Sequence, residues 1–309
     1  MPVTLTNRVR PLLVCLGLLG LAGTMFGQDL EPRSYSAAPI GTRFLVIGLA
    51  YSYGNVLLDP SVPITDVNAK IGLTAPAYLE TFRLFGRTAS LALTLPYAWG
   101  KMSGQVGEEV DRRTTTRSGF GDLRMRFSVN LLGNRALTLQ EFAGRTPATT
   151  LGVTLAVMAP TGQYDPSRLI NVGTNRWAFK PEFGLSHPMG KWVLDLAAAV
   201  WLFTDNPNFY GGQRRSQAPL WATQGHVSYS FRPGLWLAID ATYYAGGRTT
   251  VNGVVKDDRQ GNTRGGLTLA VPFAKAYSLK FSWSTGVVTR IGGKFTAFAV
   301  AFQYLWFSR

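Results

Sequence analysis

Stretches of roughly ten residues, in which apolar and polar side chains alternate, recur along almost the whole chain. Successive side chains of a strand point to opposite faces, so each stretch predicts an amphipathic strand. We count about twelve such rows, at residues 45–53, 69–79, 91–99, 123–131, 151–157, 177–185, 192–202, 221–231, 235–243, 267–273, 277–283 and 298–306. Soluble strands average nearer five or six residues. A tilted strand that crosses an apolar band of about 25 Å needs roughly ten.

The connections between rows alternate between short and long. Short ones lie at 85–87, 188–191, 232–234 and 274–276, and long ones include 101–118, 162–174, 205–217 and 248–262. Residues 133–149 fall where a short turn is due, so we interpret them as a longer periplasmic connection. Short periplasmic turns and long outer loops are typical of outer-membrane barrels. The pattern therefore predicts an all-β fold, a transmembrane antiparallel up-and-down β-barrel of about twelve strands.

The N-terminus reads as a secretory signal peptide. Arg8 and Arg10 precede an apolar run over 12–26, which is too short to span a bilayer comfortably. We expect cleavage after Gly27, so that residues 1–27 are the signal peptide and 28–309 the barrel. Residues 28–42 form either a periplasmic tail or a small plug. The only cysteine, Cys15, leaves with the signal, so the mature chain has no disulfide and no thiol nucleophile.

Composition leaves both a large soluble domain and a membrane barrel open. After removal of 27 residues from 309, 282 remain, and the loss of two arginines lowers the net charge from +14 to +12. The basic residues are scattered singly, with no basic run or helix, which argues against nucleic-acid binding. Loop arginines near anionic head groups, or a cationic lumen, explain the excess better.

Aromatic residues decide which medium the apolar rows face. Tyrosines and tryptophans recur at row ends, for example at Tyr97, Trp99, Trp192 and Trp221. Interfacial girdles of membrane barrels occupy those positions. We therefore expect the apolar rows to face lipid and the polar rows to face the lumen. The inward rows then supply these candidate lumen-lining residues: Lys70, Asp122, Arg124, Arg126, Arg176, Lys180, Glu182, Asp195, Asp240, Arg264 and Lys280.

No catalytic, cofactor or metal site can be recognised. His187 lies at a predicted turn, and His226 lies on a lumen row without a carboxylate beside it in sequence, so we interpret it as a solvated histidine. The glycine-containing turns are not followed by a helix, which excludes a phosphate-binding loop. We expect no enzymatic activity, no cofactor and no metal. A barrel-embedded hydrolase is the third and weakest alternative.

Four phrases resemble one exported bacterial family. They are LEPRSYSAAPIGTRF (30–44), SGFGDLRMRFSVNLLG (118–133), APTGQYDPSRLINVGTNRWAFKPEFGLS (159–186) and GGRTTVNG (246–253). The family is that of transporters associated with the meta-pathway of phenol degradation. The resemblance implies an outer-membrane β-barrel that passes hydrophobic or aromatic small molecules. It implies no catalytic residues.

Two functions follow as hypotheses. The first is an outer-membrane channel for small, apolar or aromatic solutes. The second is a structural or surface-interaction barrel whose lumen is filled by its own side chains. About twelve strands lie between the filled eight-stranded barrels and the water-filled porins, so a narrow lumen is expected. The partners are then membrane lipid and a small-molecule solute, with no nucleic acid, and the sequence leaves the oligomeric state open.

Overall fold

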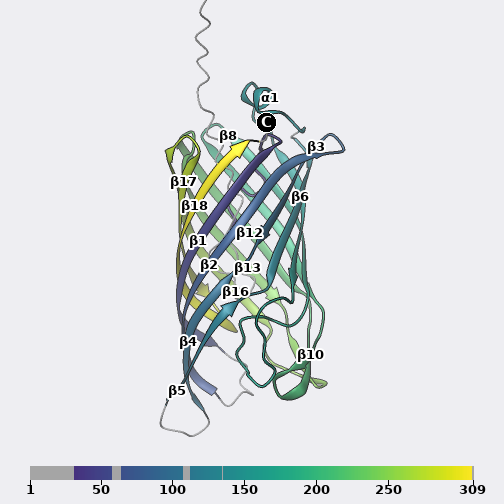
Figure 1. The fold of residues 1–309 in the computed structure, drawn as a ribbon, viewed down its shortest axis with the longest axis vertical. Coiled ribbons are helices and arrows are strands. Elements are labelled where there is room, and N and C mark those ends of the chain that lie inside the picture. The colour runs from purple at the N-terminus through teal and green to yellow at the C-terminus, as the bar shows by residue number, and fades with distance from the viewer. Residues whose placement is uncertain (1–30, 58–63, 107–111, 134, 308–309) are drawn as a thin grey trace, which may run out of the picture.

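The chain forms a closed antiparallel β-barrel (Figure 1). The computed structural model describes residues 31–57, 64–106, 112–133 and 135–307. The predicted signal peptide lies outside these residues. The elements are β1 (Thr42–Leu57), β2 (Ile64–Leu84), β3 (Arg87–Thr94), β4 (Tyr97–Val106), β5 (Arg112–Phe120), β6 (Leu123–Leu132), α1 (Leu139–Ala143), β7 (Thr150–Ala159), β8 (Ala178–Met189), β9 (Trp192–Phe203), β10 (Asn206–Phe209), the 3-10 turn η1 (Tyr210–Gly212), β11 (Gln213–Gln217), β12 (Leu220–Arg232), β13 (Leu235–Gly246), β14 (Thr249–Val251), β15 (Val254–Val255), β16 (Gln260–Ala274), β17 (Tyr277–Val288) and β18 (Gly292–Phe307).

The barrel has twelve strands, as the sequence predicts. β3 and β4 both pair with β2 and are halves of one broken strand, and β5 and β6 are halves of the next. The remaining strands of the sheet are continuous, and β1 closes the barrel because it pairs with β18 on one edge and with β2 on the other. The two breaks adjoin each other, since Gly121 N donates to Pro96 O at 2.8 Å. Proline lacks the N–H that a continuous ladder needs, which favours the break there.

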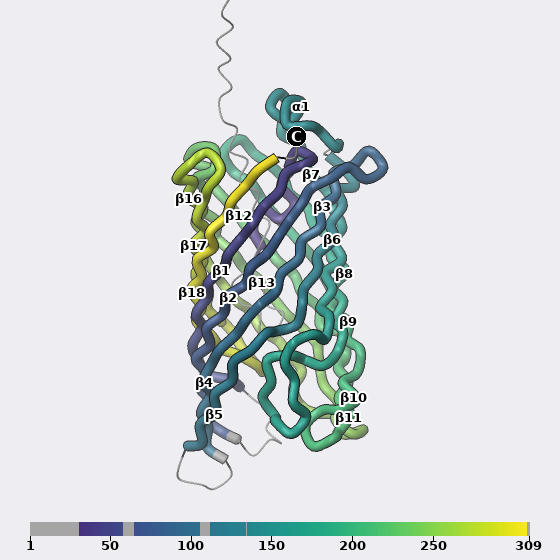
Figure 2. The backbone as a smooth tube through the Cα atoms, viewed as in Figure 1, coloured from purple at the N-terminus to yellow at the C-terminus, as the bar shows by residue number. Residues whose placement is uncertain are grey.

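Short turns and long loops separate to opposite ends (Figure 2). The end that holds the C-terminus carries the tight turns, and left-handed glycines such as Gly190 and Gly234 make two of them. The predicted longer connection over 133–149 lies at this end and contains α1, which a capping box at Thr138 begins. By the rule for outer-membrane barrels this is the periplasmic end.

The opposite end contains more strand than the sequence predicts. The residues around 101–118 continue β4 and β5 beyond the membrane band instead of forming a long loop. The loops over 205–217 and 248–262 contribute a second, four-stranded sheet of β10, β11, β14 and β15. One edge of β5 pairs with β4. Its other edge has no strand partner in the sheet and contacts the loop before β8, where Gln163 N donates to Phe120 O at 2.8 Å.

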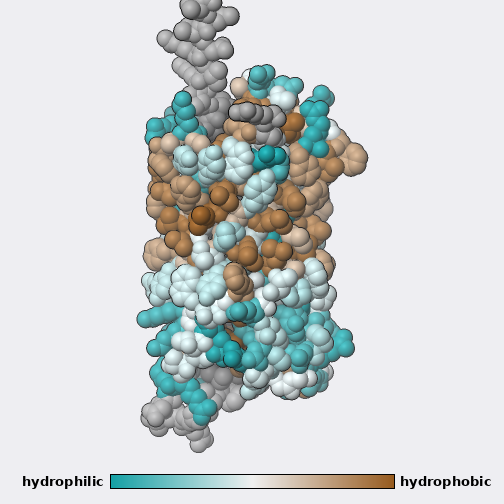
Figure 3. All heavy atoms as spheres, in the orientation of Figure 1, coloured by the Kyte–Doolittle hydropathy of each residue, from teal (hydrophilic) through white to brown (hydrophobic). Residues whose placement is uncertain are grey.

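The face of the barrel shown in Figure 3 carries an apolar belt nearer the periplasmic end, followed by a paler band and then a hydrophilic extension. Most predicted apolar rows face outward, and their large side chains are exposed; examples are Leu49, Leu155, Leu196 and Ile239. An apolar surface this extensive is what a barrel presents to lipid. Among the described residues, no helix is long and apolar enough to span a membrane.

The row at 69–79 is the exception, and our assignment of it was wrong. Ala69, Ile71 and Leu73 of β2 point into the barrel and are buried, and Lys70 lies on the outer face and is exposed. Lys70 is the register partner of outward-facing Tyr53 and extends beyond the apolar belt, where a cation meets water. An apolar row can face lipid or a dry interior, and alternation alone does not distinguish them.

An arginine introduced into the belt tests this assignment of faces. Leu155→Arg should lower the free energy of unfolding by about 2–4 kcal/mol, because a charge near mid-bilayer lacks water. Thr116→Arg, on the outer face of β5 beyond the belt, should cost about 0–1 kcal/mol. Urea unfolding in lipid vesicles measures both. Equal costs at the two positions would contradict the placement of the belt.

Candidate functional site in the barrel lumen

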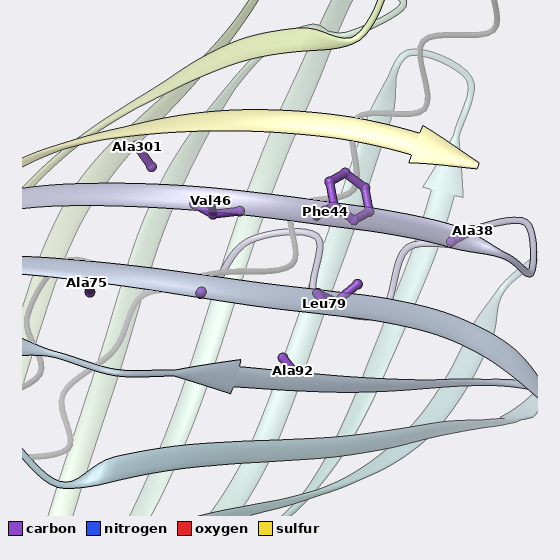
Figure 4. Close-up of a cluster of buried hydrophobic side chains, with 8 residues drawn as sticks. Ala38, Phe44, Val46, Ala75, Leu79, Ala92 and Ala301 are labelled. Atoms are coloured by element: carbon purple, nitrogen blue, oxygen red, sulfur yellow. The ribbon is translucent and has the colours of Figure 1, made fainter. Parts of the chain in front are cut away.

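One side of the lumen is mainly apolar. Buried side chains of β1, β2, β3 and β18 form a cluster that the N-terminal segment joins through Ala38 (Figure 4): Ala38, Phe44, Val46, Ala75, Ala77, Leu79, Ala92 and Ala301. A second apolar cluster lies on the same strands towards the outer end: Val56, Val67, Ala69, Ile71 and Phe295. We call these two clusters together the apolar wall.

The opposite side, mainly β6 to β9, β12, β13, β16 and β17, carries the buried charged groups. It also holds two apolar clusters: Ala178, Ala199, Trp201, Leu220, Ala222 and Tyr244, and Trp236, Ala238 and Ala270. Glu182 on β8 is the centre of the charged groups, 3% exposed. Its carboxylate lies 2.9 Å from Lys180 Nζ and 3.1 Å from Arg126 Nη2. Arg126 also pairs with Glu31 of the N-terminal segment. Two cations on one buried carboxylate compensate part of the cost of removing these charges from water.

Residues 31–41 run inside the barrel before β1 begins. Arg33 is their main anchor. Its backbone N donates to Asp195 Oδ2 at 3.1 Å, and its guanidinium donates to Ser228 Oγ at 2.9 Å and Ser230 Oγ at 2.7 Å. The guanidinium also stacks 4.6 Å from the centre of the Trp236 ring. The segment that the sequence leaves as tail or plug thus lies against both walls of the lumen.

Tyr35 is the second anchor. Its hydroxyl oxygen lies 2.9 Å from both Thr154 Oγ1 and Glu182 Oε1. Its ring rests on Gly152 and Gly184, which are paired across β7 and β8, and a Cβ at Gly184 would overlap the ring. Glycine within a strand is used where another group approaches the backbone closely. The two glycines therefore form a flat seat for Tyr35.

A histidine–carboxylate pair lies further along the charged wall. His226 Nδ1 lies 2.7 Å from Asp240 Oδ1, and Thr268 donates to Asp240 Oδ2 at 2.7 Å. His226 is 3% exposed, so our interpretation of it as a solvated histidine was wrong. Its partner lies directly across the β12–β13 hairpin, 14 residues away, where sequence adjacency does not reveal it.

The remaining predicted lumen residues lie on the inner face or at its outer mouth. Arg264 donates to Ser284 Oγ at 2.9 Å, and Lys280 and Arg124 also face inward. Asp122 is buried at the break between β5 and β6, where its carboxylate accepts from the backbone of Gly162 and Thr174 and so holds the loop before β8. Lys70 alone lies outside.

Arg176 lies at the outer mouth beside that loop. It donates to Gln217 Oε1 at 2.5 Å and stacks 4.3 Å from the Phe203 ring centre. Burial lowers its pKa to about 9, with a smaller contribution from Arg215. The guanidinium stays protonated at neutral pH.

The sequence did not identify the anchors Glu31, Arg33 and Tyr35. The signal that could have found them is the pair of inward glycines, Gly152 and Gly184, in otherwise regular strands. Within the described part of the chain, no group of three or more His, Cys, Asp or Glu side chains could hold a metal ion.

Comparisons with known proteins agree with this architecture. The structure resembles the COG4313 outer membrane channel from Pseudomonas putida F1, with a TM-score of 0.76, 24% identity, and coverage of 90% of this chain and 100% of that one. It resembles the beta domain of the Bordetella autotransporter BrkA less, with a TM-score of 0.51, 11% identity, and coverage of 85% and 99%. The transport unit of the autotransporter AIDA-I from Escherichia coli is similar with a TM-score of 0.51 and 10% identity, over 94% of this chain and 95% of that one. No curated protein sequence matches the chain.

The family resemblance in the sequence is confirmed. The family model described as "Putative MetA-pathway of phenol degradation" matches residues 54–302. The chain belongs to this family, and its fold is that of a twelve-stranded outer-membrane channel barrel.

Proposed function

We propose that the protein is an outer-membrane channel for small hydrophobic or aromatic molecules, exported through a cleaved signal peptide at residues 1–27. The observation that carries the proposal is the apolar wall. Phe44, Val46, Ile71 and Phe295 give one side of the lumen an apolar surface that an apolar solute can follow. Membership of the phenol-degradation family supports the same substrate class.

The two walls suit an amphiphilic aromatic solute. Its ring would lie along the apolar wall, and a polar substituent would meet the hydroxyls and charges opposite. Six predicted bases now lie on the inner side (Arg124, Arg126, Arg176, Lys180, Arg264, Lys280) against four acids (Asp122, Glu182, Asp195, Asp240). This surplus favours an aromatic acid over an aromatic cation of similar size. Catalysis plays no part in this proposal.

The second candidate is a structural barrel with a permanently filled lumen. Residues 31–41 and the ion pairs around Glu182 favour it, because they occupy the space that a solute would cross. The two candidates differ in whether residues 31–41 leave the lumen to let a solute pass.

Polar substitutions in the apolar wall test the channel. In vesicles that contain the purified protein, Ile71→Asn with Leu73→Asn should reduce the influx of benzoate and phenol severalfold, because the apolar surface that they follow is interrupted. Thr74→Asn, on the outer face of the same strand, is the matched control and should leave influx unchanged. The absence of any influx above empty vesicles, for every aromatic tried, would favour the structural barrel.

A further inference from the structure

Three lysines form a row on the outer surface of the barrel. Lys70 on β2 and Lys101 on β4 are direct partners in the ladder, and both are exposed. Lys294 on β18 faces outward two strands from Lys70, since Asn55 of β1 pairs with Lys294 on one side and with Asn68 on the other. We call these three residues the lysine row.

The row lies just beyond the membrane belt. Tyr53 of β1 is the partner of Lys70, and Trp99 lies two residues before Lys101 on the same face of β4. Both aromatic side chains are exposed, and the apolar residues Leu45, Ile47 and Leu49 continue towards the periplasmic end. On this face of the molecule the apolar belt gives way to paler and then hydrophilic side chains (Figure 3). Lipid head groups occupy this level.

The charges of the row have no ion-pair partner in the described part of the chain. Among the described residues, none of the three lysines forms an ion pair, whereas Arg168, Arg214 and Arg290 at the same end pair with acids. The described acids on β2 are also taken, because Asp66 pairs with Arg112 and Glu80 with Arg43. Like charges directly opposite in a sheet are destabilising. An anion that binds between Lys70 and Lys101 removes that repulsion.

We propose that the lysine row binds the phosphorylated head group of an outer-leaflet lipid, whose acyl chains lie along the outward faces of β18, β1 and β2. Register partners lie about 5 Å apart, so the ammonium groups of Lys70 and Lys101 reach one phosphate together. Lys294, across the intervening strand β1, suits a second phosphate. The fit is therefore to a lipid that carries two phosphates on one sugar head group.

The test uses the detergent-solubilised mature protein and bisphosphorylated lipid A as the probe, with native mass spectrometry as the readout. A lysine near an anionic lipid surface contributes about a fivefold factor in affinity. Lys70→Gln with Lys101→Gln and Lys294→Gln should therefore weaken binding on the order of 100-fold. Lys191→Gln with Arg232→Gln and Lys275→Gln removes three exposed cations at the periplasmic end and should change binding little.

Three further measurements fix the outcome. The triple Lys→Arg variant should retain binding, which separates lost charge from lost fold. Lipid A without its phosphates should bind no better to the wild type than to the glutamine variant. Equal losses in the outer and periplasmic variants would overturn the proposal, as would tight binding of the phosphate-free lipid. Complete displacement by millimolar inorganic phosphate would reduce the row to an ion site and overturn the lipid assignment.

Discussion

Replacing Arg33 and Tyr35 together by alanine should open the barrel and raise its ionic conductance severalfold. The two side chains make the hydrogen bonds to Ser228, Ser230 and Glu182 that hold residues 31–41 in the lumen. Hydrogen bonds to charged groups contribute about 1.5–3 kcal/mol each. Loss of both anchors then shifts the docking equilibrium by on the order of 100-fold or more. Planar-bilayer recordings of the purified protein measure the change.

A matched control and an independent variant accompany this experiment. Ser36→Ala changes the same segment at a residue whose only described hydrogen bond is through its backbone, and should leave conductance unchanged. Gly184→Val changes the surface on which Tyr35 rests and leaves residues 31–41 unchanged. The valine side chain would occupy the space of the Tyr35 ring, so this variant should also open the channel. Unchanged conductance in both opening variants, with the barrel intact, would mean that the segment is not the barrier.

The barrel could be predicted from the sequence because every strand must satisfy the same two conditions. Each must cross the belt, which requires roughly ten residues, and each must alternate because its faces meet different media. These conditions act within one strand, so they are visible in one stretch of sequence. The outward rows that contain Leu155 and Ile239 follow them directly.

The interior could be predicted only in part, because its contacts join distant strands. Lys180, Glu182 and Asp195 lie on the inner face because their rows alternate with clearly lipid-facing ones. Lys70 was misplaced because the inner side of β2 is as apolar as lipid. That dry side exists because Phe44, Val46 and Ala38 pack against it from other strands and from the N-terminal segment. The Tyr35 contact spans 147 residues to Glu182, and no local pattern encodes it.

Glu182→Gln should be the most destabilising single change in the lumen. It leaves Lys180, whose side chain is 5% exposed, without its carboxylate partner, and leaves Arg126, 14% exposed, with Glu31 alone. Removing one partner of a buried ion pair costs about 3–5 kcal/mol, since the remaining charge stays in a poor solvent. Urea unfolding in vesicles should show a loss of that size. The loss of one negative charge should also move the reversal potential towards anion selectivity.

The double variant Glu182→Gln with Lys180→Met tests whether the stability loss comes from the unpaired charge of Lys180. It restores the wild-type net charge and replaces a buried ion by an apolar side chain, so most of the lost stability should return. The reversal potential should return with it. If Glu182→Gln instead unfolds like the wild type, water reaches Lys180 and Arg126, and the charged wall is solvated. A solvated charged wall beside a dry apolar wall would still pass an amphiphile. If Glu182→Gln is strongly destabilising, water does not reach the charged wall either. The N-terminal segment must then leave the lumen before any solute can cross.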